Sequence, residues 1–461
     1  MNPTTTSRSG IATAQRPQLG LSLIELMIAI TLGMIVMAAL LALFVNVTRT
    51  NNEMAQMNRQ IENGRFAIQV LQDDVVHAGF WGSYVPQFDD LTAATVPLDA
   101  PNALPDPCLV YNTTNWTTDY LSNLIGIPVQ GWAGTCAAVA NQQANTDVLV
   151  VRHAQTCVAG VGGCENDVAG KLYFQSTLCE DEISATAQEP NTSTTIKLAA
   201  DASDEDDFYN GTTIRIVAGL GAGQSRTITG YDGSTKVATL DPGGPAWVTV
   251  PNNSSIYSFG LGYVLGTSGH IFHERGCSTL AGKRKFVSNI YYIRDHASTA
   301  GDGIPTLMRS SFDLSGGTLA HHAGPPLTQP LIEGIQGFRV EYGIDAQSDS
   351  GGTVNYAAPV IWADPLNKVS PINRGDGVPE GGYVNAAGLT CTSITDCNAA
   401  NVVAVRIHVL ARSLQATPGY TDTKTYQLGD QTMGPFNDNF KRHVFSTTVR
   451  LVNPAGRRDT P

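Results

Sequence analysis

The stretch LSLIELMIAITLGMIVMAALLALFVNV, residues 21–47, decides the fold of the N-terminal part of the chain. It holds a single charge, Glu25, and the 22 residues from Leu26 to Val47 carry none. A helix rises about 1.5 Å per residue, so this uncharged run would span about 33 Å and cross a bilayer. The run is too long for the apolar part of a secretory signal peptide, and no small-residue cleavage site follows it. We therefore expect a membrane-spanning helix.

The charges before this run predict its orientation. Arg8 and Arg16 lie within residues 1–20, which hold no acidic residue. Positive charges are retained on the cytoplasmic side of a membrane helix. We expect a single pass through the inner membrane, with everything after residue 50 in the periplasm.

The helical pattern continues beyond the membrane edge. No proline interrupts residues 21–77, so the sequence predicts one helix of 57 residues. Apolar residues recur at a helical period in its second half, at Met54, Met57, Ile61, Ile68, Leu71 and Val75. We expect this amphipathic half to pack on a globular domain through that stripe, while the first half projects from it.

Glu25 stands at the mouth of the apolar run, where a charge is costly. A carboxylate at a bilayer centre costs roughly 2.5–3.5 kcal/mol on insertion scales, and less toward the edge. A cation on a neighbouring helix would offset this cost, because a desolvated pair gains strongly from Coulomb attraction. We interpret Glu25 as a residue that sets the register of stacked helices, with an assembly role and no catalytic one.

The cysteine content predicts disulfides formed outside the cytoplasm. The eight cysteines are Cys108, Cys136, Cys157, Cys164, Cys179, Cys277, Cys391 and Cys397. The short spacings of Cys157–Cys164 and Cys391–Cys397 suit small loops, which would leave Cys108–Cys136 and Cys179–Cys277. Eight cysteines allow about a hundred connectivities, so the pairing stays open. No CxxC motif occurs, and no histidine lies at ligand spacing, so we predict no metal site and no cofactor.

The charge balance argues against nucleic acid as a partner. The formal net charge is −12, whereas a nucleic-acid-binding surface is basic. Charged residues make up only 15% of the chain, and Gly and Pro are frequent. This composition favours short strands joined by turns.

Runs rich in β-branched and aromatic residues follow the long helix. They are 146–153, 171–177, 194–200, 287–295, 337–345, 402–413 and 443–452. One long N-terminal helix followed by strands predicts an α+β fold with an antiparallel β-rich head. We assign residues 81–184 and 261–461 to this head, and we interpret 185–260 as an inserted small β module.

The N-terminal segment GLSLIELMIAITLGMIVMAALLALF resembles the methylation segment of type IV pilins and pseudopilins. The resemblance implies that a prepilin peptidase removes residues 1–20 by cutting between Gly20 and Leu21, and that Leu21 becomes the N-methylated first residue. Leu21 stands where the family most often has Phe. Glu25 matches the family's glutamate, which implies that it pairs with the α-amino group of a neighbouring subunit's first residue.

Later segments are similar to the PilW family of minor pilins. They are LQDDVVHAGFWG after the helix, YYIR followed by GDGIPTLMR, LIEGIQGFRVEYGID and the closing VFSTTVRLVNPAGRR. The resemblance implies a structural subunit that assists pilus initiation near the tip and then resides in the pilus fibre at the cell surface. It implies as partners other minor pilins, the major pilin, the prepilin peptidase and a tip adhesin.

Other motifs give little support for chemistry. The glycines of 219–223 do not follow a phosphate-loop spacing. Asp349-Ser350-Gly351-Gly352, His273-Glu274 and His321-His322 lack the partner motifs of a serine or zinc hydrolase, so we predict no enzyme activity. The acidic run Asp201–Asp207 offers oxygen ligands for calcium, but it lacks the EF-hand pattern. Arg374-Gly375-Asp376 is an RGD tripeptide that we attribute to turn composition.

Two alternative functions remain at this point. One is a J-type pseudopilin of a type II secretion system, and the other is a membrane-anchored adhesin or binding protein. The sequence leaves open whether a pilus built with this chain serves twitching motility, DNA uptake or cell adhesion.

Overall fold

The structure is a computed structural model, and it describes residues 22–91, 96–97, 99–179, 184–259, 262–276 and 278–459. The predicted α+β class is confirmed: a long N-terminal helix is followed by antiparallel sheets. The chain divides into two compact units, residues 1–57 and residues 58–461.

The predicted N-terminal helix is present as α1, Leu23–His77. Its buried residues are Gln60, Gly64, Ala67, Leu71 and Val75, which recur every three or four positions and so form one face. The expected packing stripe is therefore correct at Leu71 and Val75, but Met54, Met57 and Ile61 are exposed. Small or polar residues occupy the contact face instead at its N-terminal end, because the head approaches the helix backbone closely there.

The larger sheet of the head has eight strands among the described residues, in the order β1-β2-β12-β13-β14, with β3, β11 and β15 paired beside this path. Its strands are β1 Val129–Gly131, β2 Leu149–Ala154, β3 Tyr173–Ser176, β11 Tyr263–Gly266, β12 Arg284–Arg294, β13 Thr306–Ser315, β14 Thr318–His321 and β15 Thr328–Glu333. All pairings are antiparallel.

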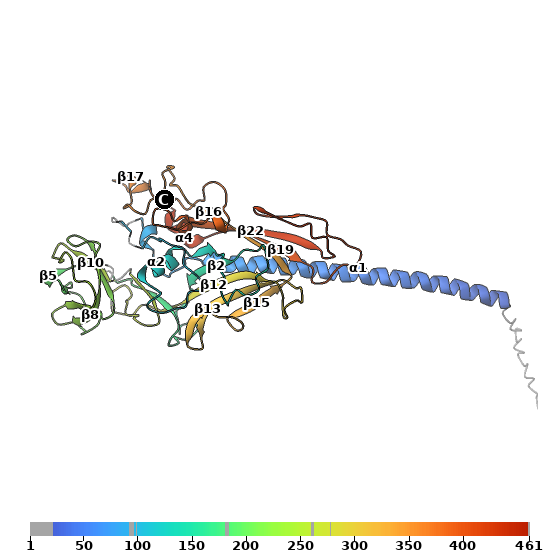
Figure 1. Cartoon of the computed structure of the whole chain (residues 1–461), viewed down its shortest axis with the longest axis horizontal. Helices are drawn as coiled ribbons and strands as arrows, with labels where there is room; N and C mark the ends of the chain where they lie inside the picture. The colour runs from blue at the N-terminus through green and yellow to red at the C-terminus, as the bar shows by residue number, and fades with distance from the viewer. Residues whose placement is uncertain are drawn as a thin grey trace, which may run out of the picture. The chain divides into compact units, whose positions relative to one another are not determined.

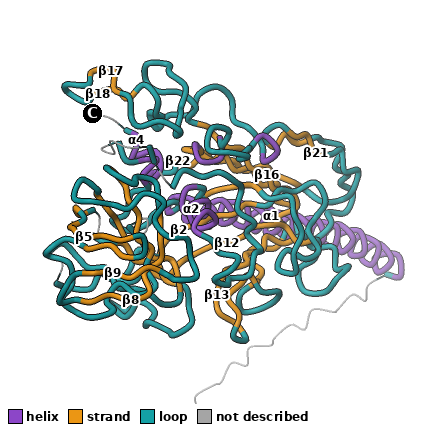
Figure 2. Tube along the Cα trace, turned by 60° about the vertical axis from the view of Figure 1, so that its left-hand side comes forward, coloured by secondary structure: helices purple, strands orange, loops and turns teal. Residues whose placement is uncertain are grey.

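A second, three-stranded sheet has the order β16-β19-β22. It consists of β16 Ile335–Ile344, β19 Val402–Arg412 and β22 Arg442–Arg450. Figures 1 and 2 show β16 and β22 on one side of α1 and β12 and β13 on the other. The C-terminal part of α1 thus lies between the two sheets, and its Ala67, Leu71 and Val75 enter a core shared with both.

The segment 185–260, predicted as an insertion, folds into a sheet of its own. Its strands pair in the order β4-β10-β7-β8-β9-β6-β5 and surround a separate apolar core that includes Ile196, Ile214 and Tyr257. They are β4 Ala185–Thr186, β5 Gln188–Thr192, β6 Thr195–Lys197, β7 Thr213–Ala218, β8 Ser225–Asp232, β9 Val237–Leu240 and β10 Ile256–Phe259. That this segment is an independent domain stays a prediction.

Short elements complete the head. They are α2 Thr118–Gly126, α4 Val452–Arg458, η1 Gln87–Asp89, η2 Ala386–Gly388, η3 Asn398–Asn401, and the hairpins β17 Trp362–Asp364 with β18 Val369–Pro371 and β20 Tyr426–Leu428 with β21 Gln431–Met433. The described disulfides Cys108–Cys136, Cys157–Cys164 and Cys391–Cys397 match three of the suggested pairs. The fourth suggested pair includes Cys277, which lies outside the described residues.

Candidate assembly site

The site begins at the first turn of α1, where Glu25 is held by a hydrogen-bonded cap. The backbone N–H of Ser22 donates to Glu25 Oε2 at 2.9 Å, and the backbone N–H of Glu25 donates to Ser22 Oγ at 3.2 Å. This reciprocal pattern is a capping box, which satisfies two N–H groups that a helix start leaves free. Its signature, Ser-Leu-Ile-Glu before an apolar run, is present in the sequence. Gly20 and Leu21 lie outside the described residues.

The apolar half of α1 has the properties of a membrane or filament-core segment. α1 is the one described helix that is long and apolar enough to cross a membrane, with a mean hydropathy of 2.8 over its most apolar window. None of that window is buried by the rest of the chain. Large exposed side chains such as Ile35, Phe44 and Leu41 therefore need a lipid or protein surround.

The head contacts α1 around Gln60 and Gly64 through hydrogen bonds and close packing. Gln60 Nε2 donates to the carbonyl oxygens of Ala411, at 2.8 Å, and of Lys441, at 3.1 Å. One turn further on, Gly64 faces the Phe445 ring so closely that a Cβ on this glycine would lie 2.1 Å from Phe445 Cε2. The glycine is thus the residue that lets β22 approach the helix.

Asp74 connects the C-terminal end of α1 to the larger sheet. Its carboxylate accepts hydrogen bonds from His153 Nε2 at 3.0 Å, from Asn289 Nδ2 at 3.0 Å and from Tyr291 Oη at 2.9 Å. Burial raises the pKa of Asp74, but these bonds, the one from His153 first, lower it more, so that the net pKa lies below its usual range. The helix is therefore held to β2 and β12 by a buried carboxylate and not by apolar contact alone.

A buried ion network ties the C-terminus to the segment that follows α1. Arg458 donates to Asp89 Oδ1 at 2.9 Å and to Asp345 Oδ2 at 3.1 Å, and Arg457 pairs with Asp89 at 3.0 Å. Burial lowers the pKa of the Arg458 guanidinium, but the charges of Asp89 and Asp345, with Tyr356, together raise it by more, so that Arg458 stays charged. These contacts hold α4, near the C-terminus, against η1, which follows α1.

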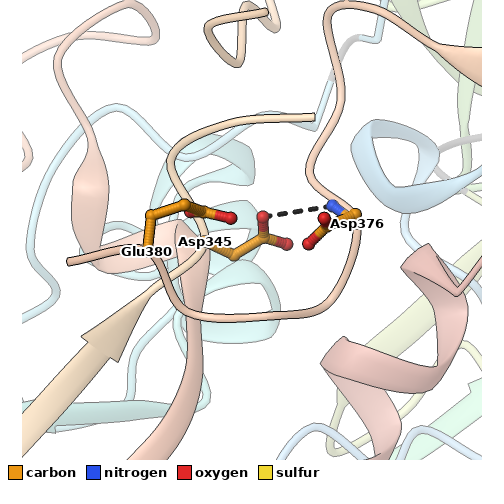
Figure 3. Close-up of side chains that lie close together, drawn as sticks. All are labelled: Asp345, Asp376 and Glu380. Carbon is orange, nitrogen blue, oxygen red and sulfur yellow. Dashed lines mark hydrogen bonds between the residues drawn. The ribbon is translucent and has the colours of Figure 1, made fainter. Parts of the chain in front are cut away.

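Three carboxylates lie close together next to this network, as Figure 3 shows. Ligand atoms of Asp345, Asp376 and Glu380 come within 4.8 Å of one another. However, Asp345 already accepts bonds from the backbone N–H of Asp376, at 3.1 Å, and of Gly377, at 2.9 Å, besides its bond from Arg458. Glu380 Oε2 accepts from the N–H of Ala346 at 2.6 Å. Each of these two carboxylates thus has protein donors, and the group stabilises a loop.

The RGD tripeptide lies in the same loop, and the structure argues against an adhesive role. Arg374 is only 2% exposed, and its guanidinium donates to the carbonyl oxygens of Asn355 and Ala358 at 2.6 and 2.9 Å. A recognition arginine has to reach a partner, and this one is committed to the fold. In the acidic run 201–207, Asp204 pairs with Lys236, while Asp206 and Asp207 accept backbone N–H groups of Gly233 and Tyr231.

One row of polar side chains was not anticipated from the sequence. Glu341, His408 and Ser446 stand side by side on β16, β19 and β22, with His408 Nε2 3.1 Å from Glu341 Oε2 and His408 Nδ1 2.7 Å from Ser446 Oγ. The strand register places Ser446 directly opposite His408, and Glu341, which is opposite Arg406, lies diagonally across from His408. We interpret the row as cross-strand hydrogen bonding that stabilises the sheet.

Comparisons with known proteins identify what this arrangement belongs to. Residues 15–41 match the prokaryotic N-terminal methylation motif, and residues 290–453, from within β12 to the start of α4, match the family of type IV pilus-assembly protein W. No curated protein and no solved structure matches the chain.

The methylation motif, the membrane-length helix and the β-rich head define a protein of the type IV pilin class. Within this class, residues 290–453 match the PilW family, as the resemblance suggested. The chain is a minor pilin of the type IV pilus that is processed by prepilin peptidase, and the family is structural. The alternative of a type II secretion pseudopilin is not better supported by these matches.

Proposed function

We propose that this minor pilin joins the pilus through α1, and that Glu25 sets its register by pairing with the cationic first residue of a neighbouring subunit. The observation that carries this proposal is the uncovered apolar half of α1 with one carboxylate in its first turn. Among the described residues, the cap with Ser22 gives the Glu25 carboxylate one hydrogen bond and no counter-charge. A neighbouring α-amino group supplies that charge on assembly.

Processing, location and partners accompany this mode of assembly. The peptidase cuts between Gly20 and Leu21, the new N-terminus of Leu21 is methylated, and the head lies in the periplasm before the subunit enters the fibre. Its partners are other minor pilins, the major pilin and a tip adhesin. The protein performs no catalysis in this role.

The test compares Glu25→Ala, Glu25→Gln and Glu53→Ala in a strain that depends on this protein for surface pili. Glutamine keeps a capping box but removes the charge, so it separates helix capping from ion pairing. Glu53 is the matched control, because it is an acid of the same helix that pairs with Arg49 within its own chain. We expect both Glu25 variants to lose most sheared surface pilin and Glu53→Ala to keep it. Normal piliation with Glu25→Gln would contradict the pairing.

A further inference from the structure

Strand β22 has a free edge. It pairs with β19 along its whole length, from Ala404–Arg450 to Arg412–Arg442, and it is the last strand of the sheet β16-β19-β22. Its exposure agrees with this position, since His443, Ser446, Thr448 and Arg450 are exposed while β19 is buried at nearly every position. Within the described residues, the other edge of β22 has no strand partner.

This edge lacks the features that normally prevent another strand from adding. Natural edge strands are protected by proline, by bulges or by inward-pointing charges. Residues 442–450 read RHVFSTTVR, contain no proline and keep a continuous register with β19. The side chains on the face toward α1 are His443, Phe445, Thr447 and Val449, and none of them is a lysine, an arginine or a carboxylate. The edge is thus regular and open to pairing.

The helix surface next to the edge is apolar and uncovered. At 3.6 residues per turn, Asn63, Gln60, Gly64, Ile68 and Ile61 follow one another around the axis of α1 in that order. Asn63 contacts Glu333 at the end of β15, Gln60 contacts Ala411 of β19 and Lys441 just before β22, and Gly64 faces Phe445 of β22. Around the helix the contacts thus pass from β15 of the other sheet to β19 and then to the outer strand β22. Ile68 and Ile61 therefore lie just past β22.

The exposure of these two isoleucines fits that placement. Ile61 is 37% exposed, and Ile68 is half-buried at the margin of the core. A strand added to β22 would run over them, and its inward side chains would remove them from water. The exposed side chains that border the same strip, Arg65 on α1 and His443 on β22, are basic in a chain whose net charge is −12.

We propose that the β22 edge and the Ile61–Ile68 strip form a docking site for an extended strand of another pilus-assembly subunit. That strand is apolar on the side that faces α1 and acidic where it meets Arg65 and His443. Main-chain hydrogen bonds supply the affinity, and alternate side chains supply the specificity. A second copy fits less well, because its β22 edge, RHVFSTTVR, has no acidic residue to place against Arg65 and His443. This inference rests on the proposed function, since it names a partner within the pilus.

The test places the photo-crosslinker benzoylphenylalanine at Thr448 of the full chain in piliated cells and maps the crosslinks to residues. It is repeated with Ile61→Glu, and with Phe66→Glu as the matched control. Phe66 is 53% exposed on the opposite side of the same helix. Thermal unfolding of the purified full chain checks that both variants fold.

We expect a crosslink to an alternating apolar and acidic segment of another pilus-assembly subunit. It should weaken at least tenfold with Ile61→Glu and persist with Phe66→Glu. A crosslink to a second copy, a crosslink that ignores Ile61, or none at all would overturn the inference. If Ile61→Glu keeps normal pili while Glu25→Ala loses them, the docking site is wrong and the proposed function stands. If Glu25→Ala keeps its pili, the proposed function fails.

Discussion

The close contact between Gly64 and Phe445 gives a sharp test of how the head holds the helix. Replacement of Gly64 by alanine puts a Cβ 2.1 Å from Phe445 Cε2 and 2.4 Å from Cδ2, so the ring or the helix has to move. Overpacking of this kind costs about 1–3 kcal/mol. Alanine regains about 1 kcal/mol over glycine in a helix. Because the overlap is severe, we take the upper part of the range and expect a net loss of about 1–2 kcal/mol.

Gly33 is the matched control, because a Cβ there meets nothing within 4 Å. Gly33→Ala should leave the head unchanged. The assay is urea unfolding of the full chain in detergent micelles, followed by the fluorescence of tryptophans that include Trp81, which is 1% exposed. In a Phe445→Ala background the cost of Gly64→Ala should vanish, since the two residues are coupled. The reasoning is refuted if Gly64→Ala is as stable as the wild type, or if its cost persists without the ring.

Three further predictions concern stability. Asp74→Asn should lower the free energy of unfolding by about 1–3 kcal/mol in the same urea assay, because the buried partners His153, Asn289 and Tyr291 lose their charged acceptor. The control Asp73→Asn, at an exposed neighbour, should cost little. Equal effects of the two variants would contradict a stabilising role of the Asp74 hydrogen bonds. Burial, and next the charge of Arg152, lower the pKa of His321 to about 3. Between pH 6.5 and 3 the unfolded chain therefore binds one more proton at this site than the folded chain. The free energy of unfolding should decrease by about 1.4 kcal/mol for each unit by which the pH is lowered. His321→Gln should lose this part of the slope in urea titrations from pH 6.5 to 4, and an unchanged slope would contradict it. Removal of the Cys108–Cys136 disulfide by a double serine variant should cost about 3–4 kcal/mol, against about 2 kcal/mol for Cys157–Cys164. The reason is the longer loop, since the cysteines are separated by 28 and 7 residues, respectively. A lower urea midpoint for the variant without Cys157–Cys164 would exclude loop entropy as the cause.

Much of the fold could be predicted from periodicity, because the signals are strong and local. The uncharged run after Glu25 and the lack of proline predict α1, and β-branched runs predict β12, β16, β19 and β22. The apolar periodicity did not predict which residues of α1 are buried where tertiary contacts select the packed face. The helix face that packs on the head is chosen by the approach of β22, so Gly64 and Gln60 are buried there while Met57 and Ile61 stay exposed.

The assembly site was predictable only in part. Glu25 stands out by its position, and Ser22 would have been found from the capping-box pattern. Asp74 carries no such signal, because its partners His153 and Asn289 are far away in the sequence and meet it only when β2 and β12 pair. The burial of Arg374 could not be predicted either, because it depends on packing against residues 355–358, which no sequence motif encodes.

The central claim, that this chain is a processed subunit of the pilus, is tested most directly by intact mass. The protein would be measured in sheared surface filaments and in membranes, with and without the prepilin peptidase. We predict a filament species that lacks residues 1–20 and carries one added methyl group, and an uncut chain in membranes when the peptidase is missing. An uncut chain that stays in membranes even with the peptidase present would contradict the account.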